Sequence, residues 1–534
     1  MPDQQAMREP ARLIDLVATS SAVRAKPARL EKRACLQALF TGLDAEDLRL
    51  AATYLSGEIP QGSLQVGWSA VREAMRAGQA PALPLFAALS EAPLRRSPTI
   101  GELDRAFGEL SRVAGPGSAR QRRAILCRLF APLEEEESRF LSGLLLGELR
   151  QGALRAEVLE ALADAFSAET DSLRRAVMFS GSLGEVVGAL ARGGPEALLR
   201  FGPRPGVPIE PMLAAQAEDV REAVQGLHGR AAVEWKLDGV RIQVHKRGGD
   251  VRLFSRQLRD VTALAPEVVE RIGALPASTV ILDGEVTGLD AGGRPLPFQD
   301  LMSRFSREEK SPAPGSRLVP LFFDVLELDG VSFVERPYVE RREALERLLP
   351  AYALVPQRVV DGVEEAEAAY REALAAGHEG VVVKAPGGLY TAGRRGAAWR
   401  KVKPALTLDL VILAAEWGHG RRTGFLSNLH LGARDLEDPM RFHMLGKTFK
   451  GLTDAMLQEM TADLLALETS RDDHVVHVRP VRVVEIAFDE VQRSPRYDSG
   501  FALRFARVKR FRPDKSAHEA DTLEDVRRIF AARR

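Results

Sequence analysis

Cysteine is scarce in this chain of 534 residues, which contains only Cys35 and Cys127. The two lie far apart in helix-like sequence, so they offer neither a disulfide framework nor a CxxC metal pair, and a four-cysteine zinc site is excluded. No apolar run approaches the roughly 20 residues that a membrane span needs, and no signal-peptide core opens the chain. These absences predict a protein of the reducing cytoplasm without a membrane segment.

An excess of charge of either sign is also lacking, because 74 lysines and arginines balance 74 aspartates and glutamates. A nucleic-acid partner must therefore be argued from local patches. Arginine supplies nearly all the basic charge early in the chain, where the first two hundred residues contain only Lys26 and Lys32. Lysine is preferred where an amine must lose a proton or sit on a phosphate, so the later lysines are candidates for such roles. The length predicts about three or four domains.

The first two hundred residues predict a helical domain. Apolar residues recur at helical spacing in 140–146 and 154–166. The segments 57–64 and 147–154 share a Gly-Glu-apolar-x-Gln-Gly-small-Leu pattern, which indicates an internal duplication with two similar corners. Glycines at such corners let backbone N–H groups approach a phosphate, although plain helix-packing corners give the same pattern. Charge nearby could come from Arg120, Arg122, Arg123, Arg150 and Arg155.

Residues 201–208, Phe-Gly-Pro-Arg-Pro-Gly-Val-Pro, cannot form regular structure and indicate a domain boundary. Beyond them the pattern changes to strands with a few helices. We expect a hairpin of 241–244 and 251–254, strands at 280–286, 318–328, 379–384 and 399–403, and a helix at 364–376. In the strand 318–328, period-two alternation points Phe323 away from Phe322 and Asp324.

The stretch at 233–241, Val-Glu-Trp-Lys-Leu-Asp-Gly-Val-Arg, runs from a strand into a glycine turn. Alternation puts Val233 on a buried face and places the amine of Lys236 between the carboxylates of Glu234 and Asp238. A lysine that acts as a nucleophile must spend time uncharged, and its surroundings decide whether it can. A surface strand that ends in a turn remains the alternative for this stretch alone.

Several charged residues on one face of otherwise apolar strands are what a polyphosphate site requires. Lysines and arginines balance the phosphate charge, and carboxylates bind Mg²⁺. The chain contains no GxxxxGK[ST] sequence, so the site is not a P-loop. Each short motif is weak by itself, and their order along the chain is the stronger signal.

That order resembles the motif series of the covalent nucleotidyltransferases. The matching residues are Lys236-Leu237-Asp238-Gly239-Val240-Arg241, Ser255-Arg256, Asp283-Gly284-Glu285, Phe323-Asp324, Glu379-Gly380-Val381-Val382-Val383-Lys384, Lys401-Val402-Lys403 and the C-terminal segment 501–515. Within that superfamily the chain resembles the ATP-dependent DNA ligases of bacteria and archaea over almost its whole length. Ala506 departs from the pattern, since many relatives carry proline there.

The resemblance implies a role for each matching residue. Lys236 would attack the α-phosphorus of ATP to form lysyl-AMP, which passes to a 5′-phosphate at a nick before the 3′-hydroxyl displaces AMP. Glu234 would bind the adenine and Phe323 would stack on it. Arg241 and Arg256 would hold the ribose and phosphate side, and Glu285 and Glu379 would serve the sugar and Mg²⁺. The expected α-phosphate ligands are Lys384, Arg395, Lys401 and Lys403, and Arg510 and Lys515 would orient the leaving pyrophosphate. We also expect the clustered cations to depress the pKa of Lys236.

The C-terminal sequence predicts short strands at 409–415, 427–432, 441–445, 475–488 and 501–511, with one helix at 453–467. This composition suits an OB-fold β-barrel, as the family implies. The expected fold is therefore multidomain α+β: an all-α DNA-binding domain at 1–203, an α+β nucleotidyltransferase (adenylation) domain at 204–405 and an OB-fold domain at 406–534. The expected partner is nicked double-stranded DNA, bound by a monomer in the cytoplasm at the nucleoid.

Two alternatives come from other classes. A GTP-using capping nucleotidyltransferase shares the Lys-x-Asp-Gly core but not the N-terminal third. A DNA-binding scaffold with a dead nucleotidyltransferase domain should have lost charges of the site, and here none is missing. The sequence leaves open whether the protein serves replication, recombination or repair.

Overall fold

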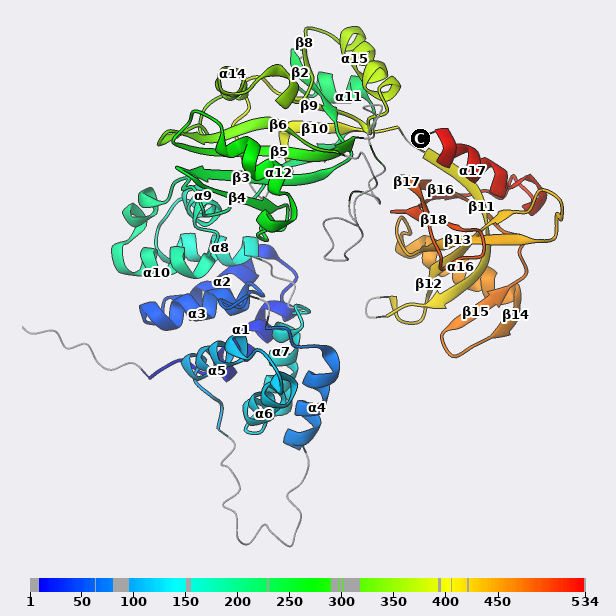
Figure 1. The fold of residues 1–534 in the computed structure, drawn as a ribbon. Coiled ribbons are helices and arrows are strands. Elements are labelled where there is room, and N and C mark those ends of the chain that lie inside the picture. Colours follow the sequence, from blue (N-terminus) through cyan, green and yellow to red (C-terminus); the bar gives the residue numbers. More distant parts are fainter. Residues whose placement is uncertain are drawn as a thin grey trace, which may run out of the picture.

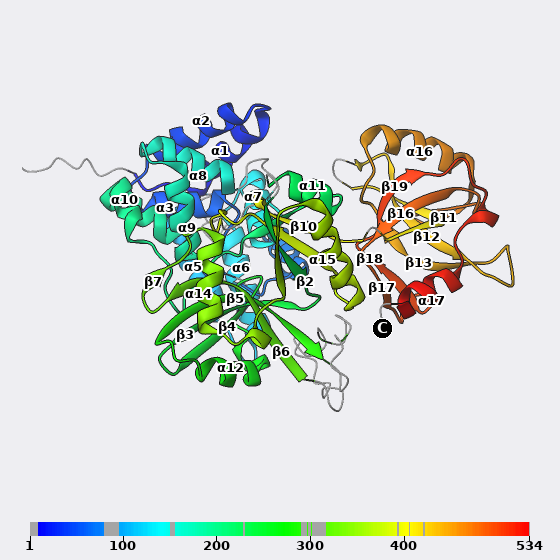
Figure 2. The ribbon, with the colours of Figure 1, turned by 90° about the horizontal axis from the view of Figure 1, so that it is seen from above.

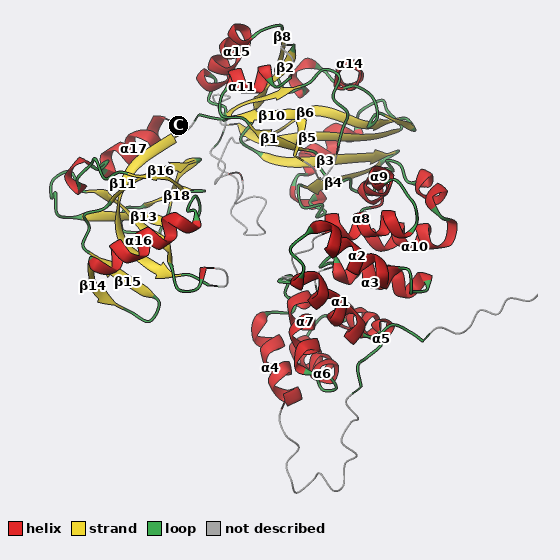
Figure 3. Ribbon diagram, turned by 180° about the vertical axis from the view of Figure 1, so that it is seen from behind, coloured by secondary structure: helices red, strands yellow, loops and turns green. Residues whose placement is uncertain are grey.

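The computed structural model describes residues 9–62, 64–79, 96–149, 155–227, 230–289, 296, 301, 317–391, 395–404, 406–419 and 422–532. It is a mixed α+β protein, with helices alone in the described N-terminal part and strands gathered in the rest (Figure 1). Figure 3 shows the same division from behind. The predicted fold class is confirmed, apart from the closure of the C-terminal barrel.

The N-terminal part consists of packed helices. Their bounds are α1 Leu13–Ala25, α2 Arg29–Phe40, α3 Ala45–Leu55, α4 Trp68–Gln79, α5 Ile100–Arg112, α6 Ser118–Phe130, α7 Glu135–Leu145, α8 Arg155–Ala165, α9 Thr170–Ser180 and α10 Leu183–Gly193, followed by the 3₁₀ turn η1 Pro195–Arg200. The helices predicted at 140–146 and 154–166 correspond to α7 and α8. Residue 154 itself lies outside the described residues.

Helices α1–α4 and α5–α8 are two copies of one arrangement. Helix α2 packs on α8 while α4 packs on α6, and α1 packs on α7 while α3 packs on α5. The residues that precede α1 and α5 pair with each other: the N–H of Leu13 donates to the carbonyl of Pro98 at 2.8 Å, and that of Ile100 to Ala11 at 2.9 Å. This reciprocal exchange is what a two-fold relation produces, so the duplication inferred from the sequence has a structural counterpart.

The two similar corners follow α3 and α7. Gly57 and Gly147 have φ angles of 82° and 68°, and the next N–H in each copy reaches back to a carbonyl of the last helical turn, Glu58 to Thr53 at 3.1 Å and Glu148 to Gly143 at 2.7 Å. This is a helix-ending motif that needs a left-handed residue, which explains both glycines. Residues 150–154 of the second corner lie outside the described residues, and phosphate binding at the corners stays a prediction.

The described residues of the middle part form two five-stranded sheets. The first has the order β1-β10-β9-β2-β8, with β1 Leu213–Gln216, β10 Arg395–Val402, β9 Gly380–Lys384, β2 Ala231–Lys236 and β8 Gln357–Val360. Helices α11 Val220–Gln225 and α15 Val363–Ala375 share a buried core with one face of this sheet. The other face carries Glu234 and Lys384, so period-two alternation holds along β2 and β9.

The second sheet has the order β4-β3-β5-β6-β7, with β4 Asp250–Ser255, β3 Val240–Arg247, β5 Thr279–Leu289, β6 Arg317–Leu328 and β7 Val331–Ser332. Its core includes residues of α12 Pro266–Gly273 and α14 Tyr338–Leu348 and of the 3₁₀ turn η3 Ala351–Ala353; another such turn is η2 Thr262–Leu264. The predicted hairpin, strands and helix of this part are confirmed. One register shift matters, because Gly284 pairs with Phe322 and Asp283 with Asp324, which leaves Phe323 in a bulge.

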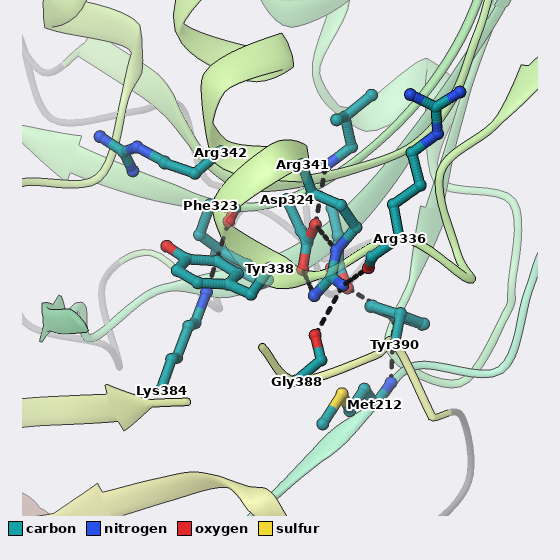
Figure 4. A network of polar contacts seen from close by, with 12 residues as sticks. Met212, Phe323, Asp324, Arg336, Tyr338, Arg341, Arg342, Lys384, Gly388 and Tyr390 are labelled. Carbon is teal, nitrogen blue, oxygen red and sulfur yellow. Dashed lines mark hydrogen bonds and ion pairs between the residues drawn. The ribbon is translucent and has the colours of Figure 1, made fainter. Parts of the chain in front are cut away.

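The bulge corrects the alternation expected along β6. Phe322 packs into the core of the second sheet, but Phe323 and Asp324 both reach the polar cluster between the sheets (Figure 4). An extra residue in one strand shifts the phase of alternation, so Asp324 does not return to the face of Phe322. A bulge beside a site is a common way to aim a side chain.

The segment that joins the helices to the first sheet has no regular structure, as predicted, but it is docked on β3. The side chain of Gln243 accepts from the N–H of Ile209 at 2.7 Å and donates to its carbonyl at 3.1 Å. The N–H of Gly206 donates to Nδ1 of His245 at 3.1 Å. Buried contacts therefore hold this Pro/Gly segment against the middle part.

The C-terminal part lies beside the two sheets when the molecule is viewed from above (Figure 2). Its strands are β11 Leu406–Trp417, β12 Leu426–Arg434, β13 Phe442–Thr448, β14 Glu468–Arg471, β15 Val475–Val478, β16 Val483–Phe488, β17 Glu490–Arg493, β18 Phe501–Arg504 and β19 Arg507–Phe511. The helices are α16 Asp454–Ala466, which was predicted, and α17 Leu523–Ala532, which was not; η5 Ala517–Glu519 is a 3₁₀ turn.

The predicted OB-fold is confirmed, but within the described residues its sheet does not close into a barrel. Within the described residues β13-β12-β11-β15-β14 form one path, β16 pairs with β11 and β19, and β17–β18 is a separate hairpin. The strand expected at 475–488 is two strands, since β15 and β16 pair with different parts of the long β11. The strand expected at 501–511 breaks at Phe505, whose φ of 55° cannot continue a strand.

Candidate active site

The turn after β2 puts Lys236 at the edge of the cluster between the two sheets. β2 lies between β8 and β9, so its polar side chains face partners from both neighbours. Gly239 must be glycine, because a Cβ there would lie 2.4 Å from the carbonyl oxygen of Val286 on β5. The Lys-x-Asp-Gly sequence thus allows the strand to turn directly against β5 and enter β3.

Lys236 forms an ion pair with Glu379, and Lys403 binds the other oxygen of the same carboxylate. The Lys236 side chain keeps 23% of its surface exposed. Burial lowers the pKa of Lys236, but Glu379, Glu285 and Asp238 together outweigh burial and leave that pKa raised. The expected depression of this pKa by neighbouring cations is therefore wrong, because carboxylates surround the amine.

The three carboxylates around Lys236 differ in their proton affinity. Burial raises the pKa of Glu285 to about 7 and that of Asp238 to about 6. Burial also acts on Glu379, but Lys236 and Lys403 outweigh it, so the pKa of Glu379 is lowered. Glu285 and Asp238 therefore gain or lose protons near neutral pH, whereas Glu379 stays ionised.

Glu234 is at the buried end of the cluster, with 3% of its side chain exposed. Its Oε2 accepts from the amine of Lys384 at 2.6 Å, and its Oε1 accepts from the hydroxyl of Tyr338. The Lys384 amine also lies 4.8 Å from the ring centre of Phe323 and 4.3 Å from that of Trp399. Figure 4 shows Lys384, Tyr338 and Phe323 side by side. The structure thus pairs Lys384 with Glu234, beside Phe323, whereas Lys236 pairs with Glu379.

Arg241 on β3 is held by Asp283 of the neighbouring strand β5. Its guanidinium binds both oxygens of Asp283, at 3.0 and 2.6 Å, and donates to the carbonyl of Met212 at 2.7 Å. The hydroxyl of Tyr390 donates to the same Asp283 at 2.7 Å. Arg241 also lies over the ring of Phe323 at 5.4 Å. These contacts fix Arg241 and connect it with the docked segment that carries Met212.

Family models match three successive parts of the chain. The ATP dependent DNA ligase domain matches residues 211–403, the ATP dependent DNA ligase C terminal region 422–515 and the DNA ligase N terminus 85–163. A relative from Anaeromyxobacter dehalogenans (strain 2CP-C) is 49% identical over 523 residues, 97% of this chain and 99% of its own length. The chain belongs to the ATP-dependent DNA ligase family.

Other comparisons agree with this assignment. A relative from Beutenbergia cavernae is 46% identical over 525 residues and, like the first, bears the name "Probable DNA ligase". The solved structure entitled "Pmar-Lig_PreS3" has a TM-score of 0.62 at 19% identity, and the match covers 93% of this chain and 99% of that one, which supports the fold alone. The ligase is an enzyme that uses ATP to seal nicks in double-stranded DNA.

Some predicted site residues of the ligase lie outside this cluster. Arg256 is exposed in the turn after β4. Arg395 begins β10, but its side chain lies outside the described residues. Arg510 pairs with Glu485 at 2.6 Å, and Lys515 pairs with Asp409 of β11 at 2.7 Å, so both terminal cations bind carboxylates of their own domain. Lys401 is half-buried on β10.

A different part of the C-terminal domain faces Lys236. Lys403 lies 3.2 Å from Asp489, and Asp238 is influenced electrostatically by Glu490 and Arg504. The β17–β18 hairpin therefore lies close to Lys403 and Asp238, while the Lys515 side chain is bound to Asp409.

Sequence reasoning missed the residues that support the cluster. Tyr338 and Arg342 of α14 and Gln357 of β8 contact Glu234, and Tyr390 contacts Asp283. The spacing of Tyr338, Arg341 and Arg342 puts all three on one helix face, and this was the available signal. Across the described residues no helix is long and apolar enough to cross a bilayer.

Proposed function

We propose that Lys236 is the residue that carries AMP. Its amine would attack the α-phosphorus of ATP, forming a phosphoramidate as the bond to pyrophosphate breaks. The observation that carries this proposal is the position of Lys236: it is partly exposed, sits in the Lys-x-Asp-Gly turn and shares Glu379 with Lys403. Lys384 is 1% exposed and could not reach a phosphate without leaving Glu234.

The amine must lose a proton before it attacks, and the ion pair with Glu379 keeps that proton on Lys236. Phosphoryl transfer depends mostly on positioning and on charge stabilisation. Lys403 and Lys401 are suited to balance the α-phosphate, and Arg395 and Arg256 are further candidates on the phosphate side. The AMP group then passes to the 5′-phosphate of the nick, and the 3′-hydroxyl displaces it.

Glu285 and Glu379 are the proposed ligands of Mg²⁺. The described residues contain no group of three or more His, Cys, Asp or Glu side chains arranged around one ion. This fits Mg²⁺, which proteins often hold through one or two carboxylates together with substrate phosphates. When bound, the ion would neutralise phosphate charge. Burial raises the pKa of Glu285 to about 7, and a nearby cation would favour its ionised form.

The base of ATP is proposed to bind at the Glu234 end. Glu234 would accept from the adenine amine, Phe323 would stack on the ring, and Arg241 would hold the ribose side. The pairing of Lys384 with Glu234 supports a role for Lys384 at this end and not at the α-phosphate.

The proposed domains are 1–203, 204–405 and 406–534. The helical domain would bind duplex DNA through its backbone, since glycine corners suit phosphates more than base edges. The C-terminal domain would close over ATP so that Arg510 and Lys515 orient the pyrophosphate, then swing away. Both residues are now bound to Glu485 and Asp409, so this role requires a rearrangement. We further propose that the ligase acts as a monomer at the nucleoid.

The decisive experiment is labelling with ATP radiolabelled at the α-phosphate, followed by denaturing electrophoresis. Lys236→Ala and Lys236→Arg should both abolish the label, because neither provides an amine that can lose its proton. Lys26→Arg, at a half-exposed lysine of the helical domain, is the matched control and should label normally. Labelling of the Lys236→Ala variant would overturn the assignment.

A further inference from the structure

The carboxylate of Glu234 is held by donors from several elements at once. Lys384 of β9 binds Oε2, and the Tyr338 hydroxyl of α14 binds Oε1. Arg342 of α14 lies 3.6 Å from the same Oε1, and the side-chain amide of Gln357 on β8 donates to it at 3.4 Å. Such a carboxylate has little freedom to turn, because each rotation would leave buried donors unpaired.

Tyr338 is itself fixed by the helix that carries it. It is 1% exposed, and its hydroxyl also accepts from Gln357. Three residues further along α14, Arg341 binds Asp324 at 2.7 Å and lies over the Tyr338 ring at 5.6 Å. Figure 4 shows this helix face directed at Asp324 and Phe323. Tyr338 therefore links Glu234 to a helix that the Arg341–Asp324 ion pair holds in place.

A fixed, ionised carboxylate discriminates between purine bases. A carboxylate offers only acceptors, so it suits the exocyclic amine of adenine, which donates, and repels the O6 of guanine, which accepts. A mobile or protonated group could turn or donate, and would tolerate guanine better. Selectivity for adenine then depends on the residues that hold Glu234 as well as on Glu234.

We propose that Tyr338 is a positioning residue that fixes Glu234 for adenine selection, assisted by Arg342 and Gln357. The proposal rests on the proposed function, in which Glu234 accepts from the adenine amine. Tyr338 touches neither ATP nor the reacting atoms, so its effect appears in nucleotide binding and selectivity. The chemical step at Lys236 is left intact.

Tyr338→Phe tests this with the smallest change, since the ring that packs against Lys384 and Arg341 remains. The KM for ATP in self-adenylation should rise about tenfold, which corresponds to about 1.4 kcal/mol. The rate at saturating ATP should stay within about twofold, and the preference for ATP over GTP should fall. Tyr352→Phe is the matched control, because Tyr352 is 73% exposed on η3, and it should change none of these.

Two further variants make the test specific. Gln357→Leu removes a weaker donor and should raise the KM for ATP by a smaller factor than Tyr338→Phe. In a Glu234→Ala background, Tyr338→Phe should have no additional effect on KM, because its target is gone. An equal effect in that background, an unchanged KM, or a loss confined to the saturated rate would each overturn the proposal. Absence of any label in the unmodified ligase would instead refute the proposed function.

Discussion

The ion pair between Arg341 and Asp324 gives a sharp prediction about stability. Both side chains are 0% exposed, and the guanidinium binds the carboxylate at 2.7 and 3.1 Å. Arg341 also donates to the carbonyls of Arg336 at 2.7 Å and Gly388 at 2.9 Å. Replacing Arg341 with Met would leave a buried carboxylate and two carbonyls without these donors.

The expected cost of Arg341→Met is about 3–5 kcal/mol, which is typical when one partner of a buried ion pair is removed. For a domain of about 200 residues this lowers the melting temperature by roughly 10 °C. The measurement is thermal unfolding followed by tryptophan fluorescence, since Trp235 and Trp399 both lie in the sheet beside this pair. Arg347→Met is the control on the same helix: Arg347 is 72% exposed and pairs weakly with Glu343 at 4.0 Å.

A double variant distinguishes the effect of the lost ion pair from the effect of the lost side-chain volume. The double variant Asp324→Leu with Arg341→Met removes both charges, so it should be more stable than either single variant. A melting temperature for Arg341→Met close to that of Arg347→Met would refute the reasoning. So would a double variant less stable than both singles, because volume and shape would then outweigh the unpaired charge.

Three more predictions concern the carboxylates, the C-terminal domain and the helical domain. Burial raises the pKa of Glu285 to about 7, so the folded ligase binds this proton more tightly than the unfolded chain, and its stability falls as the pH rises from about 4.5 to 7. The Glu285→Gln variant should therefore become more stable relative to the unmodified ligase by up to about 3 kcal/mol across that pH range. Melting temperatures of the two proteins that change in parallel from pH 5 to 7.5 would contradict this. Lys515→Ala should slow self-adenylation strongly but leave the sealing of a nick already carrying 5′-AMP nearly unchanged, and equal loss of both activities would exclude the closing-domain proposal. A ligase that begins at Val207 keeps the docked Ile209, so it should still form lysyl-AMP but bind nicked DNA weakly, with a deficit that shrinks as salt rises; full nick affinity would speak against the helical domain as the DNA clamp.

Much of the fold followed from local pattern. Apolar spacing predicted α7, α8, α15 and α16, and period-two alternation predicted β3 through β6. These succeeded because helix and strand periods are properties of a continuous segment. The prediction of two similar corners was also confirmed, because a left-handed residue at a helix end strongly favours glycine, as at Gly57 and Gly147.

The errors arose where distant segments decide the outcome. The OB-fold was predicted, but not whether its sheet closes, because closure depends on which strands pair, and β11 is long enough to pair with both β15 and β16 without closure. Asp324 was expected opposite Phe323, yet a register shift against β5 brought both to one cluster. The pKa of Lys236 was expected to fall, and the carboxylates brought from β5 and from the residue before β9 raise it.

By itself, the sequence determined the family, the lysine in its glycine turn and the face of each strand that carries charge. The tertiary structure decided which charges meet. Glu379 reaches Lys236 because β9 pairs beside β2, although 143 positions separate the two residues. The same pairing directs Lys384 to Glu234, and α14 adds Tyr338. Periodicity gives the direction of a side chain, but its partner depends on the order of strands in the sheet, which long-range packing sets.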